Sequence, residues 1–195
     1  MAINLVKGQK IDLTKNNAGL KKLLVGLGWD PYETKGFFAA FKQNNIDIDA
    51  SVIMLRDDKL VDKKDLVYFG HLKSECGGVV HTGDNLTGDG DGDDEQIIVD
   101  LMKVNQAINR LVFVINIYDC TSRKQNFGMI KNAFIRVADY NNNSNIATYD
   151  LSSECKDCTA MVVAEVYRHN NEWKFSAVGR GTNDTSLGDM LSAFK

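Results

Sequence analysis

The sequence predicts an all-β-dominated protein, an antiparallel β-sandwich of about ten short strands with a few short helices. One observation is that short runs rich in β-branched and aromatic residues recur along the chain, separated by turn-forming residues. A second is the run at 111–118, which is apolar on both faces and typical of a central buried strand. A third is residues 173–178, which alternate between apolar and polar through Ala177 and so indicate a strand with one buried face.

The N-terminal part of the chain contains two sites that interrupt strands, Lys7-Gly8 and Pro31. Residues 3–6 and 11–13 are predicted to be short strands that pair as a hairpin around Lys7-Gly8. The next strand, 23–28, runs toward the only proline, Pro31, which stops regular structure. Residues 32–45 are irregular and contain three phenylalanines, which we expect to cover the core; an exposed contact patch is the alternative.

The rest of the chain is predicted to consist mainly of further short strands. Strands are predicted at 47–55, 66–69, 78–81, 96–101, 111–118, 133–138, 146–151, 160–169 and 173–178. A helical turn is predicted near 104–109, and a short C-terminal helix at 187–194 packs Leu187, Leu191 and Phe194. Asn170-Asn171 predicts a two-residue hairpin, because Asn tolerates left-handed backbone angles.

Length and composition indicate one domain, residues 1–195. The chain has 195 residues, 44% of them hydrophobic, which is enough for one well-filled core. The net charge is only −3 and gives no indication of a nucleic-acid surface. The N-terminus lacks the basic and apolar regions of a signal peptide, and no run reaches the roughly 18 apolar residues of a membrane span. We therefore expect a cytoplasmic protein with no direct membrane span.

The four cysteines are Cys76, Cys120, Cys155 and Cys158. Without an export signal, reduced thiols are the simplest expectation. Cys155 and Cys158 form a CxxC, but the chain has no second CxxC or paired histidines for zinc, and no βαβ setting typical of redox motifs. We expect structural or incidental thiols, with redox or metal chemistry as the alternative.

The stretch HTGDNLTGDGDGDDE at 81–95 is the strongest functional signal. It places six carboxylates within twelve residues: Asp84, Asp89, Asp91, Asp93, Asp94 and Glu95. Two such charges 4 Å apart repel by about 4 kcal/mol at an effective dielectric of about 20, so a bound divalent cation would stabilise the loop. Oxygen ligands favour Ca²⁺, and the interleaved glycines permit a tight wrap. A solvated acidic loop without an ion is the alternative.

The loop begins like an EF-hand but does not continue as one. Counting from Asp89, an EF-hand needs Gly at position 6 and Glu at position 12, where this chain has Asp94 and Asp100. The following residues indicate a strand rather than an exiting helix. Asp47 and Asp49 share one face of their strand and could close over the ions, and Asp119 at a strand end is a further candidate ligand.

Six motifs together resemble the TerD family of tellurium-resistance and general stress proteins. They are GLGWD (26–30), DIDASV (47–52), the acidic stretch (81–95), RKQNFG (123–128), NAFIRV (132–137) and EVYRHNNEWKF (165–175). The motifs follow the family's order and span nearly the whole chain. Residues 32–45 look like an insertion relative to the family, and the Cys155/Cys158 pair departs from its usual pattern.

The resemblance implies a β-sandwich that binds two Ca²⁺ through Asp84, Asn85, Asp91, Asp93, Asp94 and Glu95. Asp47 or Asp49, with Asp119, would complete the two shells. It also implies a role in tellurite resistance and chemical-stress response, and a superfamily relative in eukaryotes binds cyclic AMP.

We expect a non-enzymatic calcium-binding module acting within a multi-protein assembly of other stress and tellurium-resistance proteins, including membrane-associated ones. One alternative is a metal-dependent phosphoester hydrolase with His81 as general base. The other is calcium-dependent membrane attachment, in which Phe127, Arg123 and Lys124 would flank the ions.

Overall fold

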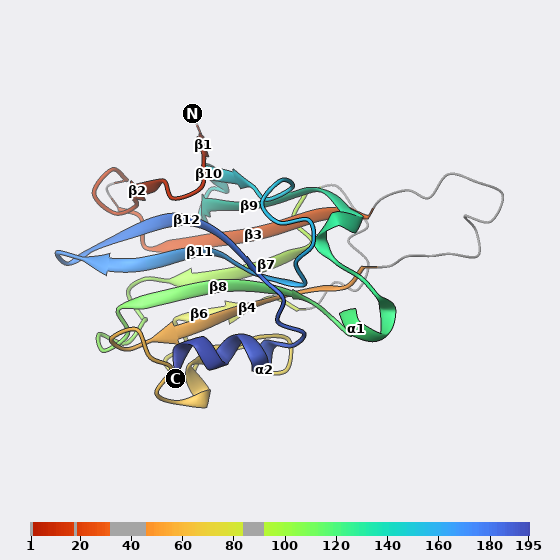
Figure 1. The fold of residues 1–195 in the computed structure, drawn as a ribbon. Coiled ribbons are helices and arrows are strands. Elements are labelled where there is room, and N and C mark those ends of the chain that lie inside the picture. The colour runs from red at the N-terminus through yellow and green to blue at the C-terminus, as the bar shows by residue number, and fades with distance from the viewer. Residues whose placement is uncertain (1, 18, 32–45, 84–91) are drawn as a thin grey trace.

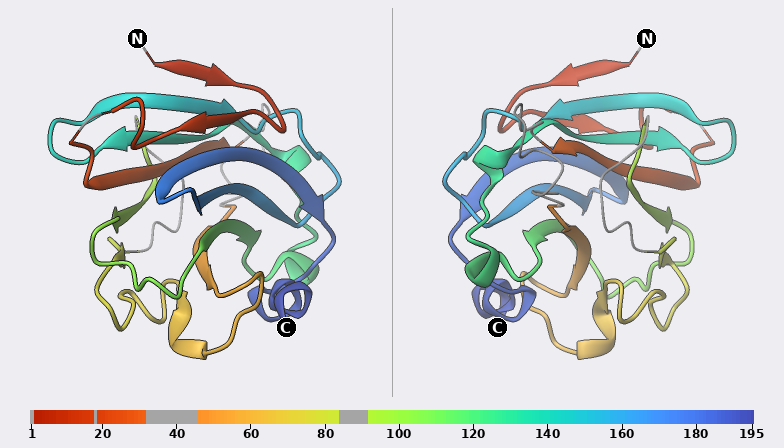
Figure 2. Two further views of the ribbon diagram at one scale, coloured as in Figure 1. Left: turned by 90° about the vertical axis from the view of Figure 1, so that its left-hand side faces the viewer. Right: turned by 90° about the vertical axis from the view of Figure 1, so that its right-hand side faces the viewer.

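The computed structural model describes residues 2–17, 19–31, 46–83 and 92–195. In these ranges the chain forms two stacked six-stranded sheets, which confirms the predicted β-sandwich (Figure 1). The two views along the strands show β1 at the edge of one sheet and the C-terminal helices beside the other sheet (Figure 2).

The first sheet, called sheet A, has the order β1-β10-β9-β3-β7-β6. Its strands are β1 (Ile3–Leu5), β10 (Ser144–Asp150), β9 (Ile130–Asp139), β3 (Lys22–Pro31), β7 (Glu95–Asp100) and β6 (Val79–His81). All neighbours pair antiparallel except β1, which runs parallel to β10.

The second sheet, sheet B, has the order β2-β12-β11-β8-β4-β5 and is antiparallel throughout. Its strands are β2 (Lys10–Asp12), β12 (Glu172–Thr182), β11 (Ala160–His169), β8 (Arg110–Ile117), β4 (Ile48–Leu55) and β5 (Leu66–Val67). The predicted hairpin at Asn170-Asn171 is confirmed, since both residues have positive φ, 53° and 63°, and join β11 to β12.

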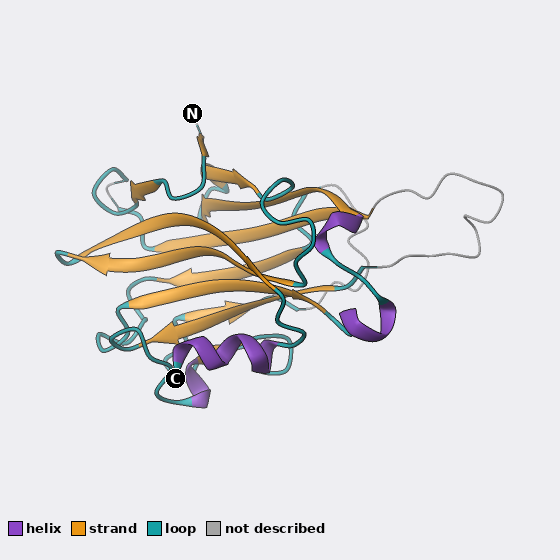
Figure 3. Cartoon of the chain, viewed as in Figure 1, coloured by secondary structure: helices purple, strands orange, loops and turns teal. Residues whose placement is uncertain are grey.

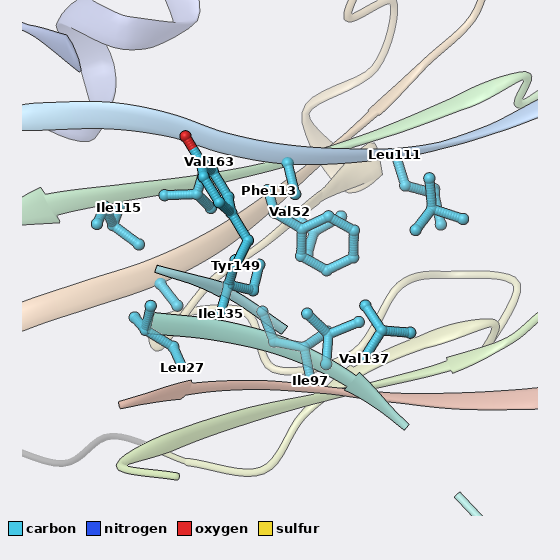
Figure 4. Close-up of a cluster of buried hydrophobic side chains, with 14 of the residues drawn as sticks. Leu27, Val52, Ile97, Leu111, Phe113, Ile115, Ile135, Val137, Tyr149 and Val163 are labelled. Carbon is cyan, nitrogen blue, oxygen red and sulfur yellow. The ribbon is translucent and has the colours of Figure 1, made fainter. Parts of the chain in front are cut away.

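The main core lies between the sheets. Side chains from β3, β7 and β9 of one sheet point toward those of β4, β8 and β11 of the other (Figure 4). Phe113 is 2% exposed at the centre of this layer. Alternation along each strand thus explains which residues are buried inside and which lie on the outer faces.

A second apolar cluster covers the outer face of sheet B and explains why β4 and β8 are apolar on both faces. Ile53, Val112 and Val114 point outward there and pack with Met190 of α2 (Leu187–Met190). The C-terminal helix is therefore confirmed, continuing as the 3₁₀ turn η4 (Leu191–Phe194), with Leu187, Leu191 and Phe194 partly buried against the cluster. The other short helices in the described ranges are α1 (Cys120–Arg123), η2 (Lys63–Asp65) and η3 (Phe127–Met129) (Figure 3).

The predicted N-terminal hairpin is wrong. β1 pairs with β10 in sheet A, whereas β2 pairs with β12 in sheet B, so the two strands lie in different sheets. Gly8, with φ of 79°, carries the chain from one sheet to the other, and its N–H donates to the Ala177 carbonyl. Each three-residue strand adds to the edge of a large sheet. Pairing with such an edge is more stable than pairing in a short isolated two-stranded hairpin.

The helical turn predicted near 104–109 is also not observed; this described stretch forms turns. Val104 and Ile108 are buried, but side chains around this stretch accept hydrogen bonds from its backbone N–H groups. The Asn105 carboxamide accepts from Ala107 N–H, and the Asp100 carboxylate accepts from Met102 N–H. Such local bonds compete with helix formation.

The expectation of four reduced thiols is wrong for one pair. Cys155 and Cys158 form a disulfide, with their Cα atoms 5.5 Å apart, while Cys76 and Cys120 are free thiols. Turns between β10 and β11 bring the two Cα atoms within the range that a disulfide can span. Residues 32–45 with their phenylalanines lie outside the described residues.

Candidate functional site

The candidate site is the acidic end of the sandwich, where β7 begins beside the end of β3 and the start of β4. Of the ten predicted ligands, Asp84, Asn85, Asp89 and Asp91 lie outside the described residues. The structure places the other six, Asp47, Asp49, Asp93, Asp94, Glu95 and Asp119, on three different layers of the sandwich.

Asp93 lies on the outer face of sheet A, where it binds Arg136 of β9. Arg136 Nε and Nη2 donate to its two carboxylate oxygens over 2.6 and 2.7 Å, and Gln96 Nε2 donates to Oδ2 over 3.1 Å. The Asp93 side chain is 1% exposed. A two-pronged guanidinium–carboxylate pair is among the stronger ion pairs in proteins, so Arg136 neutralises this carboxylate.

Asp94 holds the end of β3. Its N–H donates to the Leu27 carbonyl, and its Oδ2 accepts from Trp29 N–H over 2.8 Å. This carboxylate therefore helps to fix the acidic segment on the backbone of sheet A.

Close packing against the acidic segment explains the two glycines of the GLGWD motif. A Cβ on Gly26 would lie 2.2 Å from the Asp93 carboxyl carbon, and one on Gly28 would lie 2.5 Å from the Gly92 carbonyl oxygen. The two glycines of β3 therefore let the acidic segment pack directly against the backbone of sheet A.

Glu95 points between the two sheets and joins them. Its side chain has no exposed surface, and its Oε2 accepts from Ala50 N–H of β4 over 2.7 Å. His81 Nε2 lies 3.5 Å from the same oxygen. Because His81 Nδ1 accepts from Gly83 N–H, the neutral ring carries its proton on Nε2, facing Glu95.

Asp47, Asp49 and Asp119 belong to the sheet B side. Asp47 is 7% exposed and immediately precedes β4. Asp49 lies on the outer face of sheet B, where its Oδ2 accepts from Asn116 Nδ2 over 3.4 Å. Asp119 is half-exposed at the start of α1, where it accepts from Ser122 Oγ and lies 3.8 Å from Arg123 Nε.

The donors at this end are carboxylate oxygens, which suit a hard cation such as Ca²⁺. Within the described ranges, no three His, Cys, Asp or Glu side chains converge closely enough to hold a metal ion. A metal centre here would therefore also draw on oxygens of residues 84–91.

The structure disfavours the two alternative functions. His81 is 2% exposed and both ring nitrogens face protein groups, which leaves it no access to a substrate as a general base. Phe127 is 6% exposed, so it cannot insert into a membrane as the attachment hypothesis requires. In the part of the chain that the structure describes, no helix has the length and apolar character needed to cross a bilayer.

Sequence reasoning missed the partners of the acidic residues. Arg136 was part of the quoted NAFIRV motif, and a cation placed between the apolar Ile135 and Val137 of a strand was the available signal. The backbone amides of Trp29 and Ala50 had no such signal, because any residue supplies an N–H and only the fold aims it.

Comparison with known proteins gives consistent matches over the chain. The TerD domain model matches residues 1–194. Stress response protein SCP2 of Bacillus subtilis (strain 168) is 60% identical over 198 residues, with both chains fully covered. Tellurium resistance protein TerD of Serratia marcescens is 41% identical, covering 93% of this chain and 91% of that protein.

The fold also matches a crystal structure of a homologue of telluride resistance protein (TerD) from Streptomyces coelicolor A3(2). The TM-score is 0.69 at 23% identity, covering 91% of this chain and 97% of that one. At this identity the likeness concerns the fold alone.

Proposed function

Because the chain belongs to the TerD domain family, we propose that it is a non-enzymatic, calcium-binding module of the cellular stress response that contributes to tellurium resistance. The observation that carries the calcium proposal is the anchoring of the acidic stretch. Asp94 and Glu95 are held by backbone amides of β3 and β4, so the described end of the acidic stretch is fixed on buried strands.

The proposed ligands are Asp94, Glu95 and either Asp47 or Asp49 from the start of β4, together with Asp84, Asn85, Asp89 and Asp91 from the acidic stretch. An ionised carboxylate presents two oxygens of the kind that a hard cation such as Ca²⁺ prefers. We leave Asp93 out of the proposed shell because Arg136 holds both of its oxygens. Asp119 is left out because it is half-exposed at the start of α1, where it accepts from Ser122 and lies 3.8 Å from Arg123.

Bound calcium would offset the repulsion among the loop carboxylates and order the end of the sandwich. A ligand that binds only the folded state at 100 times its Kd adds about 2.7 kcal/mol of stability. For a domain of this size that corresponds to a rise of about 5 to 10 °C in the melting temperature.

The test is calcium titration by calorimetry on chelator-treated protein, together with thermal melts. We expect micromolar or tighter binding of two ions per chain and a raised melting temperature. Asp91→Asn should weaken binding without changing the calcium-free melt, whereas the matched control Asp157→Asn, on an exposed turn, should change neither. Absence of binding heat together with an unchanged melt would refute the calcium proposal.

We further propose that calcium-ordered protein acts with other proteins of the same response, including membrane-associated ones. The test is affinity capture from tellurite-treated cells with calcium or with chelator. We expect retained proteins to be lost with chelator and with Asp91→Asn. Equal retention in all samples would contradict a calcium-dependent assembly.

A further inference from the structure

The disulfide between Cys155 and Cys158 lies in the connection between β10 and β11. The two cysteines are three positions apart, so the bond joins two residues of the same connection rather than two strands of the sandwich. A disulfide that closes so short a loop removes little entropy from the unfolded chain, and it adds less stability than one that closes a long loop. Stapling of the fold is therefore a weak explanation for this bond.

Hydrogen bonds hold the same loop in place without either sulfur atom. The Cys158 carbonyl accepts from Phe127 N–H of η3 over 2.9 Å. Thr159 N–H donates to the Thr182 carbonyl of β12 over 3.1 Å, and Thr159 Oγ1 donates to the Asp184 carbonyl over 2.6 Å. Because these bonds fix the loop to η3 and to the end of β12, the loop should keep its conformation when the disulfide is reduced.

The two cysteines differ in their exposure to solvent. Cys155 is partly exposed, whereas Cys158 is 6% exposed. Both sulfur atoms lie against Gly181 of β12, where a Cβ would be 2.8 Å from Cys155 Sγ and closer still to Cys158 Sγ. In thiol–disulfide exchange, access decides which sulfur is attacked. The exposure therefore favours attack at Cys155 and makes Cys158 the leaving sulfur. The CxxC spacing is also that of disulfide oxidoreductases.

We propose that Cys155 and Cys158 form a thiol–disulfide exchange site whose reaction partner is a dithiol. One thiol of the partner loses its proton and attacks Cys155 Sγ, the bond between the two cysteine sulfurs breaks, and Cys158 leaves as a thiolate that takes up a proton. The second thiol of the partner then loses its proton and attacks the partner's own sulfur in this mixed disulfide. The partner's disulfide forms, and Cys155 leaves as a thiolate that takes up a proton.

Two electrons and two protons thus pass from the dithiol to the protein, and the reverse reaction restores the Cys155–Cys158 bond. This activity uses none of the proposed calcium ligands. It can therefore be tested with or without calcium, and its failure would leave the calcium proposal unchanged.

The test is reduction of the folded protein by dithiothreitol, followed by alkylation and peptide mass spectrometry. We expect Cys155 and Cys158 to become alkylated only after reduction, and the partly exposed thiol Cys76 to be alkylated in both forms. Cys120 is buried and should stay unmodified in both, as a marker of the intact fold. The melting temperature of the reduced protein should fall by less than about 10 °C.

The same experiment contains the results that would overturn the proposal. Reduction that requires denaturant, or that is always accompanied by alkylation of Cys120, would show a purely structural disulfide. Glutathione disulfide, added after the reductant is removed, should restore the Cys155–Cys158 bond and the original melting temperature. A protein that stays reduced under these conditions would contradict reversible exchange.

Two serine variants form a matched pair that tests the order of the sulfurs. Cys158→Ser leaves Cys155 as a free thiol, and Cys155→Ser leaves Cys158. We expect glutathione disulfide to form a mixed disulfide with Cys155 about tenfold faster than with Cys158, because Cys155 is the more accessible. Protection of Cys120 from alkylation reports whether each variant is folded. Equal rates in the two folded variants would overturn the assignment of Cys155 as the attacked sulfur.

Two dithiols distinguish the source of the electrons. Faster reduction by a thioredoxin-type protein than by dithiothreitol, at equal dithiol concentration, would assign a protein dithiol as the partner. The reverse order would assign a small-molecule dithiol. Failure of both to reduce the folded protein would overturn the proposal.

Discussion

Among the described residues, Arg136 is the cation that pairs with the nearly fully buried Asp93 carboxylate. Removing one partner of a buried ion pair leaves the other charge uncompensated, which costs several kcal/mol. We expect Arg136→Ala to lower the free energy of unfolding by about 3 kcal/mol. The measurement is urea denaturation in chelator.

A surface ion pair provides the matched control. Arg110 contacts the exposed Asp58 and lies 3.5 Å from Glu165, and its own side chain is 37% exposed, so Arg110→Ala should cost less than about 1 kcal/mol. Adding Asp93→Asn to Arg136→Ala should recover part of the loss, because the amide carries no charge. Equal costs for Arg136→Ala and Arg110→Ala would contradict the structural role of the pair.

Gly26 tests how closely the acidic segment packs on β3. The Cβ of an alanine would meet all three carboxyl atoms of Asp93 at 2.2–2.3 Å, and Asp93 is held by Arg136 and cannot move away freely. We expect Gly26→Ala to destabilise the protein by about 1–3 kcal/mol, measured by denaturation. In the control Gly188→Ala, the nearest atom is 3.6 Å away and the residue is helical, so stability should stay equal or rise slightly. A neutral Gly26→Ala would contradict this close packing.

At the scale of elements, the β11–β12 hairpin depends on its two turn residues. Asn170 and Asn171 both have left-handed backbone angles between His169 and Glu172, which pair directly. The left-handed backbone conformation is strained for β-branched residues and unstrained for glycine. Asn171→Val should therefore cost about 1–2 kcal/mol in thermal or urea unfolding, whereas Asn171→Gly should be neutral or stabilising.

The control for the hairpin is Asn4→Val in strand β1, where the backbone is extended and the side chain is exposed. We expect its effect to stay within about 0.5 kcal/mol. If Asn171→Val were as mild as Asn4→Val, the turn would not have the backbone angles described here.

At the scale of the whole molecule, Tyr149 makes the free energy of unfolding depend on pH in the alkaline range. Its ring lies in the inter-sheet core (Figure 4), and its hydroxyl donates to Glu154. Burial, followed by the hydrogen bond to Glu154 and the nearby negative charges, raises the pKa of Tyr149 above its ordinary value. An unfolded tyrosine ionises near pH 10, so the folded state keeps a proton that the unfolded state loses.

The stabilisation from neutral Tyr149 is therefore complete below about pH 10 and is lost as the pH rises above that value. We expect the urea midpoint of the parent protein to fall more steeply between about pH 9.5 and 11 than that of Tyr149→Phe, which has no titrating hydroxyl. Measuring both midpoints across this range tests the expectation. Parallel curves would show that Tyr149 does not carry the pH dependence.

Much of the fold follows from local pattern. The strand at 160–169 was predicted with the bounds that β11 has, and the apolar run at 111–118 correctly indicated a central strand. These predictions succeeded because side-chain alternation and apolar runs are local consequences of burial. The N-terminal hairpin failed because two three-residue strands have too little local preference to select a partner, and the available sheet edges decided it.

The candidate site was likewise predictable in part from the sequence and in part only from the tertiary structure. Sequence alone determined the β-sandwich, the resemblance to the TerD family and the concentration of carboxylates at 81–95, because residue type and spacing carry that information. Only the tertiary structure decided which layer each carboxylate occupies: Asp93 with Arg136 outside sheet A, Glu95 between the sheets, and Asp49 outside sheet B. The physical reason is that a carboxylate takes its role from the donors around it, and those donors come from strands distant in the sequence.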